Sequence, residues 1–143
     1  LVEGPTEKAL FNWLIAKDNN WRSFSKYKIA IIDVIGKFNF HRYMTLLDKF
    51  GIPYGLILDD DENKKHHQAI NEMVKNYPCY KRLAKPVFIP NCIEPFLELD
   101  LPSRADLKPI EIIKKLENGE IQNNSLQKLK DKFTEALNIS LII

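Results

Sequence analysis

The sequence predicts an α/β fold: a mostly parallel central sheet of about four strands flanked by helices, with a helical C-terminal extension. Two observations lead to this class. Short apolar runs alternate with amphipathic segments, and the clearest run, KIAIIDVI at 28–35, is β-branched and nearly continuous. Such a run is typical of a strand buried on both faces. Strand and helix in short alternation indicate βαβ units, whose crossovers are right-handed.

Four short runs are the expected strands. Leu1-Val2 opens the sequence as a strand end, and the run 28–35 follows the first helical segment. The runs YGLIL at 54–58 and PVFI at 86–89 have the same character, more weakly. Ligands of parallel α/β sheets gather at the carboxyl ends of the strands, so the residues that follow each run are the first candidates for a site.

Three amphipathic segments between these runs, 6–17, 40–50 and 63–77, are expected to be helices. Gly51 stands where the second would end. Their apolar stripes are, in order, Leu10, Trp13 and Leu14; then Tyr43, Leu46, Leu47 and Phe50; then Ile70, Met73 and Val74.

The last third of the sequence changes character. Residues 100–108 are an expected loop, and two helices are expected over 110–117 and 124–137. Ser125 is the expected N-cap of the second helix. The apolar tail 139–143 is either a final strand or the stub of a further region.

Composition narrows the class of protein. The 143 residues are 45% hydrophobic and 28% charged, which suits one soluble domain. No apolar run could span a bilayer and no signal peptide is apparent, so we expect a cytoplasmic protein. The net charge of 21 − 19 = +2 is too weak to indicate nucleic-acid binding by itself. Cys79 and Cys92 lack the spacing of a zinc site. The first residue is Leu1, inside an apparent strand, so we expect a fragment of a longer chain.

The first acidic motif is LVEGPTE at 1–7. An expected strand ends in Glu3, Gly4 allows a sharp turn, and Thr6 has the position of an N-cap before Glu7. Across such a turn, Glu3 and Glu7 can point into one crevice. The alternative is that Glu7 only complements the helix dipole and that Glu3 is solvated.

The second acidic motif is LILDDDEN at 56–63, where three aspartates follow a buried strand. If the strand geometry persists, Asp59 and Asp61 share a face and Asp60 points away. Clustered carboxylates repel one another unless a cation lies between them, and Mg²⁺ prefers such oxygen ligands. The alternative is a solvated acidic turn. Because both motifs follow parallel strands, together they predict a metal site.

The order of these motifs resembles the Toprim domain, a Rossmann-like fold: a strand ending in Glu-Gly, a strand end with Gly, and a strand ending in Asp-x-Asp. The stretches LVEGPTEK at 1–8 and DVIGKFNFHRYMTLLDKFGIPYGLILDDDEN at 33–63 are similar to the OLD-family (overcoming lysogenization defect) ATP-dependent endonucleases, Gabija-type anti-phage nucleases included. The resemblance is loose beyond residue 90. It implies a Toprim catalytic domain over 1–100 and a helical extension of the same domain over 101–143.

The resemblance implies a two-metal endonuclease that cuts nucleic acid, with DNA preferred over RNA. The two ions, Mg²⁺ or Mn²⁺, would lie about 3.5–4 Å apart. One would activate the attacking water and the other would stabilise the leaving oxygen. Glu3 is also a candidate for proton transfer, and Gly36 would let its loop approach the site, as would Gly4. The implied ligands are Glu3, Glu7, Asp59 and Asp61.

Two positions extend this set. Glu94, in NCIE at 91–94, follows the fourth apolar run and is a candidate ligand of the second ion. Its alternative is a surface carboxylate at a helix start. Lys108 resembles a family lysine that would steady the transition-state phosphate as a point charge.

Other residues near the motifs are weaker candidates. Lys37 and Arg42, beside the Gly36 loop, are possible contacts to the phosphate backbone. The adjacent His66 and His67 face different ways on a helix, so we expect them to be solvated.

Three functions stay open. OLD-like nucleases carry an ABC-type ATPase domain, and this sequence has no GxxxxGK[ST] loop, so the ATPase is expected elsewhere in a full-length chain or on a partner subunit. A homo-oligomer without a membrane partner is the expected context. The second possibility is another Toprim enzyme, primase-like or topoisomerase-like. The third is a non-catalytic Toprim-fold module that binds nucleic acid or a partner.

Overall fold

The structure of the chain, a computed structural model, describes residues 1–139. The possible final strand over 139–143 falls outside the described residues, apart from Ile139. The five longer helices begin and end within two residues of the predicted segments. The elements in chain order are α1 (Pro5–Lys17), the 3-10 helices η1 (Arg22–Tyr27) and η2 (Lys37–Asn39), α2 (Phe40–Phe50), β1 (Ile57–Asp59), α3 (Lys65–Asn76), β2 (Val87–Ile89), α4 (Ile93–Phe96), α5 (Lys108–Glu117) and α6 (Asn123–Ala136).

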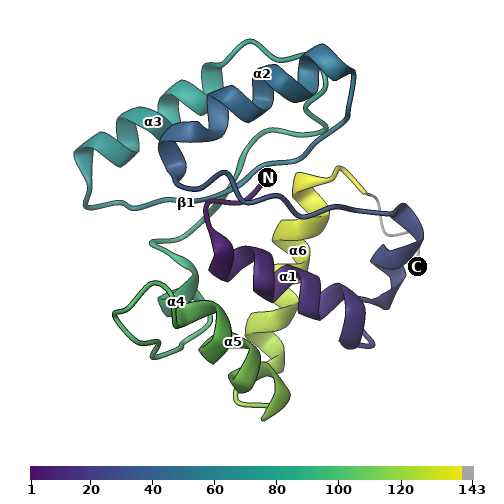
Figure 1. Cartoon of the computed structure of the whole chain (residues 1–143), viewed down its shortest axis with the longest axis vertical. Helices are drawn as coiled ribbons and strands as arrows, with labels where there is room; N and C mark the ends of the chain where they lie inside the picture. Colours follow the sequence, from purple (N-terminus) through teal and green to yellow (C-terminus); the bar gives the residue numbers. More distant parts are fainter. Residues whose placement is uncertain (140–143) are drawn as a thin grey trace.

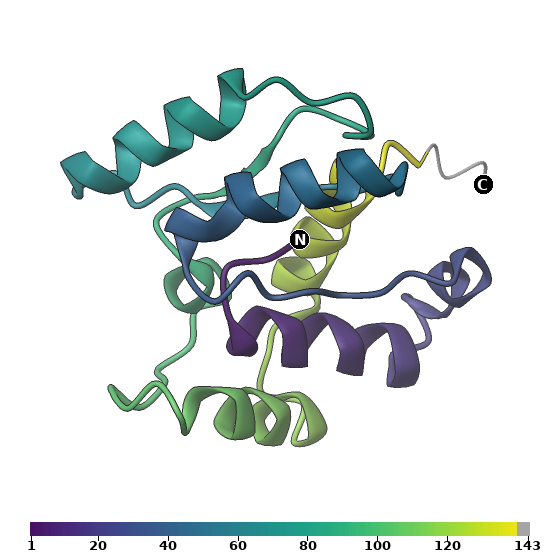
Figure 2. The same ribbon diagram turned by 45° about the horizontal axis from the view of Figure 1, so that its top comes forward.

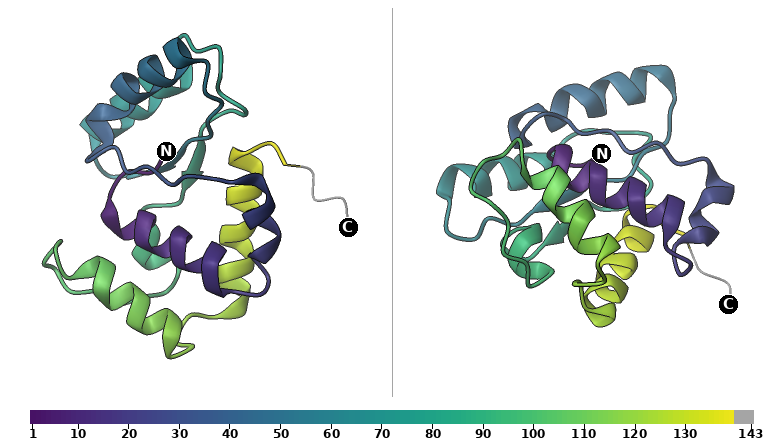
Figure 3. Two further views of the ribbon diagram at one scale, coloured as in Figure 1. Left: turned by 45° about the vertical axis from the view of Figure 1, so that its right-hand side comes forward. Right: turned by 60° about the horizontal axis from the view of Figure 1, so that its bottom comes forward.

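The molecule has three layers, with a small parallel sheet in the middle (Figure 1). Helices α2 and α3 lie together on one side of the strands, and α1, α5 and α6 lie on the other. The turned views show the same separation (Figure 2). It also holds when the right-hand side comes forward (Figure 3, left). The predicted α/β class is therefore confirmed, with helices flanking a parallel sheet.

Strands β1 and β2 form the sheet, with Ile57 opposite Val87 and Asp59 opposite Ile89. They run parallel and are connected through α3, so they make one βαβ unit. The carboxyl ends of both strands consequently meet at one edge, where Asp59 ends β1.

Two extended segments continue this layer without reaching strand length. Residues 1–3 lie beside β1, joined by a 3.0 Å hydrogen bond from the Ile57 N–H to the carbonyl of the first residue. Residues 32–34 lie beyond them, through a parallel bridge between Val2 and Asp33. Four extended segments are thus parallel neighbours in the order 32–34, 1–3, β1 and β2.

The prediction of about four strands is wrong in number, because residues 1–139 contain two. The run 28–35 is an extended edge segment with a single bridge, not a strand. Its neighbour explains the difference. Residues 1–3 are followed by α1, which begins at Pro5, so they are long enough for one bridge only. A β-ladder needs consecutive residue pairs.

Strand side chains alternate between two apolar clusters. Ile57 and Val87 face the larger cluster, which includes the buried sides of α1, α5 and α6. Leu56 and Leu58 face the smaller cluster, with α2 and α3. Burial on both faces is the reason why these runs are continuously apolar in the sequence.

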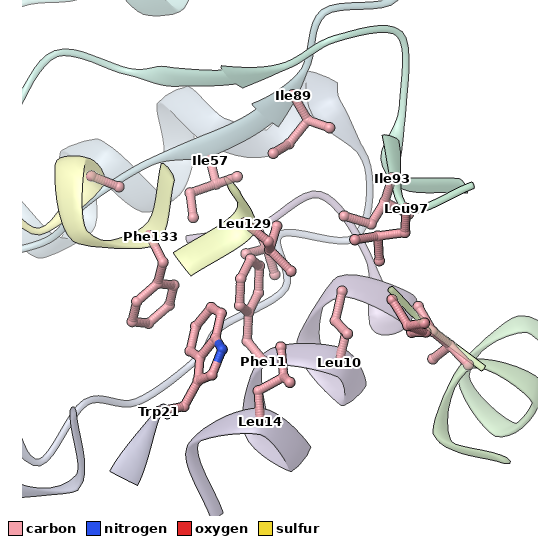
Figure 4. Close-up of a cluster of buried hydrophobic side chains, with 14 of the residues drawn as sticks. Leu10, Phe11, Leu14, Trp21, Ile57, Ile89, Ile93, Leu97, Leu129 and Phe133 are labelled. Atoms are coloured by element: carbon pink, nitrogen blue, oxygen red, sulfur yellow. The ribbon is translucent and has the colours of Figure 1, made fainter. Parts of the chain in front are cut away.

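The larger cluster is centred on Phe133 of α6, which is 3% exposed. Its ring centroid lies 5.0 Å from that of Phe11 and 5.3 Å from that of Trp21 (Figure 4). The ring centroid of Phe24 also lies 5.0 Å away. A Cβ added at Gly55 would lie 2.3 Å from the main-chain oxygen of Ala136. The end of α6 therefore packs directly on the backbone that leads into β1.

Two predicted apolar stripes are partly wrong: Met73 of the α3 stripe is 37% exposed, and the α2 stripe holds for Tyr43 and Leu47 only. Helix α2 buries Phe40, Met44 and Leu47, whereas Leu46 and Phe50 of the predicted stripe are 49% and 71% exposed. The buried three have the spacing i, i+4 and i+7, which forms one helical face.

Two expected helix starts are corrected as well. Helix α6 has Gln122 as its N-cap, because the Leu126 N–H already donates to the Gln122 carbonyl at 3.1 Å, and Ser125 is buried in the first turn. Lys108, expected in a loop, is the first residue of α5, where Pro109 fits the first helical turn. Within residues 1–139, no helix combines the length and the apolar character needed to cross a membrane.

Candidate functional site

Two acidic stretches that are far apart in the sequence meet at the carboxyl edge of the sheet. Glu3 ends the first extended segment, and Asp59 ends β1. The Asp59 N–H donates a hydrogen bond to Glu3 Oε1 at 2.9 Å, although the two residues are 56 positions apart. The structure therefore brings Glu3 and Asp59 together, as their positions after parallel strands predict.

Glu7 joins this pair from the first turn of α1. Its Oε2 accepts the Gly4 N–H at 3.1 Å, and Gly4, not Thr6, is the N-cap. The sharp-turn interpretation of Gly4 is also wrong, because its φ of −151° is extended backbone that any residue adopts. Pro5, at the start of the helix, fixes the direction in which α1 departs.

Glu94 and Lys108 form an ion pair at the border of the cluster. Glu94 lies in α4, just after β2, and Lys108 Nζ donates to its Oε1 at 2.5 Å from the start of α5. Their side chains are 20% and 30% exposed. The negative charge of Glu94 acts on Glu7, so this ion pair adjoins the acidic cluster.

Asp61 has surroundings that differ from those of the other carboxylates. Its φ of 52° is left-handed, so the strand geometry ends before it and the predicted alternation of Asp59 and Asp61 does not hold. Its two oxygens accept hydrogen bonds of 2.8 Å from Lys37, Lys64 and His67. Asp61 is thus surrounded by donors and has little capacity left for another cation.

Lys37 is the buried centre of the site, with 2% of its surface exposed. Besides Asp61, its Nζ contacts the main-chain oxygen of Asp59 at 2.5 Å and Glu3 Oε1 at 3.2 Å. Gly36 directs it inward: its φ of 99° favours glycine, and its N–H donates to the Glu3 carbonyl at 2.8 Å. In this arrangement Lys37 is not available to a phosphate backbone.

Burial and mutual repulsion raise the pKa of three carboxyl groups. Burial, followed by the charges of Glu3 and Glu7, raises the pKa of Asp59 to about 9. Burial raises the pKa of Glu7 to about 7 and also raises that of Glu3. Burial alone would also raise the pKa of Asp61, but hydrogen bonds from Lys37, Lys64 and His67 outweigh it and lower the value to about 2. Ionising Glu3, Glu7 and Asp59 together is therefore unfavourable unless a cation lies among them.

Asp59→Asn is expected to stabilise the metal-free protein by an amount that grows with pH. The folded protein holds the Asp59 proton up to a pKa of about 9, whereas the unfolded chain releases it near 3.8. This raised pKa contributes stability that is fully present below about pH 4 and is lost as the pH rises toward 9. The variant has no such loss, so its advantage in unfolding free energy over wild type should be larger at about pH 9 than at about pH 5.

Urea denaturation in EDTA at both pH values measures this advantage. Taking the difference between variant and wild type removes the contributions of groups elsewhere in the chain. An advantage that is equal at the two pH values, or smaller at the higher one, would contradict the buried, carboxylate-rich surroundings of Asp59.

The donor set suits a hard divalent ion by its chemistry. Carboxylate oxygens are the ligands that Mg²⁺ and Mn²⁺ prefer, and an ion would offset the repulsion among Glu3, Glu7 and Asp59. As they stand, however, no three His, Cys, Asp or Glu side chains of residues 1–139 are grouped so as to hold one. The Lys37 ammonium lies among these carboxylates and contacts Glu3 and Asp61.

Sequence reasoning missed two partners of Asp61. His67 was expected to be solvated, but it lies at the start of α3, close to the turn that carries Asp61, and it is bonded to that carboxylate. Lys64 immediately precedes α3 and reaches the same side chain. Lys64 and His67 follow Asp61 closely in the sequence, and this short spacing was the signal that could have predicted their contacts with it. Arg42 is exposed on α2, and no ion pair of its guanidinium occurs within the described part of the chain.

Comparison with known proteins finds a family model that matches the first part of the chain. Residues 1–61 match the family model described as "Overcoming lysogenization defect protein-like, TOPRIM domain". The match spans Glu3, Glu7, Lys37, Asp59 and Asp61 and ends before Glu94 and Lys108. No curated protein and no solved structure matches the chain significantly.

Proposed function

Since the chain carries a Toprim domain of the OLD-like family, matched over residues 1–61, we propose that it is the catalytic part of a metal-dependent endonuclease. The reaction is hydrolysis of a phosphodiester bond in nucleic acid. The observation that carries the proposal is the convergence of Glu3 and Asp59, from two separate stretches, at the carboxyl edge of the sheet.

Glu3, Glu7 and Asp59 are the residues proposed to hold a divalent ion. They approach from three elements: the segment 1–3, the first turn of α1 and the end of β1. A bound divalent ion supplies a water of lowered pKa and offsets charge on the phosphate. Glu94, on the border, is the proposed ligand of a second ion. Asp61 positions the site through Lys37, which also contacts Glu3.

Two residues are proposed to act on the substrate. Lys108 lies beside Glu94, where its ammonium would contact the scissile phosphate once Glu94 turns to a cation. Glu3 is the proposed proton acceptor, since burial raises the pKa of its carboxyl group above the ordinary value.

The cellular context belongs to the proposal as well. We take DNA as the substrate, Mg²⁺ or Mn²⁺ as the ions and two as their number. We also propose an ABC-type ATPase domain, either in the same full-length chain or on a partner subunit. The full-length protein is proposed to be a cytoplasmic homo-oligomer. The Toprim match over residues 1–61 supports a divalent metal, and the other points are carried over from the resemblance to OLD-family nucleases.

Nicking of supercoiled plasmid tests the proposal. Wild type should nick with Mg²⁺ or Mn²⁺ and not with EDTA, and Glu3→Ala should not nick with either ion. Nicking that persists in EDTA, or that is equal in Glu3→Ala, would exclude metal-dependent hydrolysis at this site.

A non-catalytic module that binds nucleic acid is the second candidate, and one observation favours it. Lys37 occupies the acidic cluster with its buried ammonium, as a permanent structural ion pair would. Such a module would bind plasmid equally with EDTA or Mn²⁺ and would leave it supercoiled, whereas the endonuclease converts it to the open circle.

A further inference from the structure

Lys37 has surroundings that are unusual for a lysine. Its side chain is 1% exposed, although lysines are almost never fully buried unless they are paired. The pairing here is complete: the ammonium contacts Glu3 at 3.2 Å, Asp61 at 2.8 Å and the Asp59 carbonyl at 2.5 Å. Its partners come from both acidic stretches, so the ammonium lies at the point where those stretches meet.

This position conflicts with that of a divalent ion. An ion held by Glu3 and Asp59 would approach the Glu3 carboxylate, whose Oε1 Lys37 now contacts, and it would bring two positive charges close to a third. A buried ammonium and a divalent ion therefore compete for the Glu3 carboxylate.

We propose that the Lys37 ammonium is a built-in counter-cation of the metal-free site, and that a divalent ion displaces it on binding. This inference rests on the proposed function, because it takes Glu3 and Asp59 as ligands. Lys37 is thus a positioning residue that offsets part of the negative charge of the metal-free site and lowers the affinity of that site for the metal.

The loop around Lys37 lies at the surface, so its side chain could move from the buried site into solvent. Gly36 and Phe38, the residues on either side of Lys37, are both exposed, and so is Ile35, at 74%. Ile35 and Gly36 both have left-handed φ, at 57° and 99°, which is strained for a β-branched residue such as Ile35. A displaced Lys37 would emerge at the mouth of the site, where a substrate phosphate is its natural partner.

Mn²⁺ titration by calorimetry tests the competition on Lys37→Met, which keeps the length of the side chain and removes its charge. We expect Lys37→Met to bind Mn²⁺ at least about tenfold more tightly than wild type, because no ammonium has to be displaced. Lys64→Met is the matched control, since Lys64 also bonds Asp61 but its side chain is 59% exposed. Its Mn²⁺ affinity should change less than about twofold.

The outcomes separate this inference from the proposed function. Equal or weaker Mn²⁺ binding by Lys37→Met, with measurable binding by wild type, overturns the displacement of Lys37 alone. Absence of binding by both proteins overturns the metal-dependent function as well.

Amine labelling of wild type provides a second test that needs no variant to fold. Acylation of Lys37, followed by mass spectrometry, should be slow in EDTA and faster with saturating Mn²⁺. A rate that Mn²⁺ leaves unchanged or lowers would overturn the displacement.

Discussion

Asp59→Asn is expected to reduce metal-dependent plasmid nicking at least about 100-fold, because it removes one negative ligand from the proposed ion site. The same change should raise the melting temperature of the metal-free protein, since Asp59 is half-buried beside the like charges of Glu3 and Glu7. Loss of activity together with a gain in stability distinguishes a functional carboxylate from a structural one. Nicking rates and thermal unfolding in EDTA measure the two effects.

Asp60→Asn is the matched control, one residue away on the same turn. The Asp60 carbonyl is held by the side chains of Gln68 and Asn71, and Asn at position 60 keeps that carbonyl. Its nicking rate should stay within about threefold of wild type, as for a side chain outside the reaction. Equal losses at Asp59 and Asp60 would mean that the turn as a whole, and not the Asp59 carboxylate, is needed.

Phe133→Ala is expected to destabilise the protein by about 3–5 kcal/mol, the usual cost of removing a buried aromatic ring. The ring is 3% exposed and contacts Phe11, Trp21 and Phe24, so truncation leaves a cavity that these neighbours line. Phe133 lies 72 residues beyond the end of the family match at residue 61, since 133 − 61 = 72. The prediction therefore makes α6 part of the fold that supports the acidic cluster.

Urea denaturation of Phe133→Ala and of Glu135→Ala, an exposed position on the same helix, measures this contribution. The control should lie within about 0.5 kcal/mol of wild type. A loss for Phe133→Ala as small as the loss for the control would show that α6 is dispensable for the fold.

The fold was predictable where the sequence pattern is local. The helix over 40–50 was placed to the residue, because its amphipathic period and Gly51 mark both bounds. Strand length was not predictable from the same kind of pattern. The run 28–35 has strand composition, yet its pairing depends on residues 1–3, which provide a partner for only one bridge. Strand pairing depends on two segments, whereas the composition of a run describes only one of them.

The meeting of Glu3 with Asp59 was predictable, because both residues follow parallel strands that must end at one edge. The burial of Lys37 was not. A lysine in a loop is solvated by default, and only the left-handed backbone at Gly36 turns this one inward. The separate role of Asp61 was hidden for the same reason, since its left-handed φ breaks the alternation that an Asp-x-Asp strand end suggests. The functional roles of these residues stay predictions.

Whether Glu3 and Asp59 hold one shared ion is tested most directly by a double-mutant cycle of Mn²⁺ affinity. Calorimetry would compare wild type, Glu3→Gln, Asp59→Asn and the double variant. We predict that each single change weakens Mn²⁺ binding by at least about tenfold. The loss of affinity in the double variant should be much smaller than the product of the two single losses, because the first change already disrupts the common site. Losses that multiply independently, or single variants that bind Mn²⁺ as wild type does, would contradict a shared site.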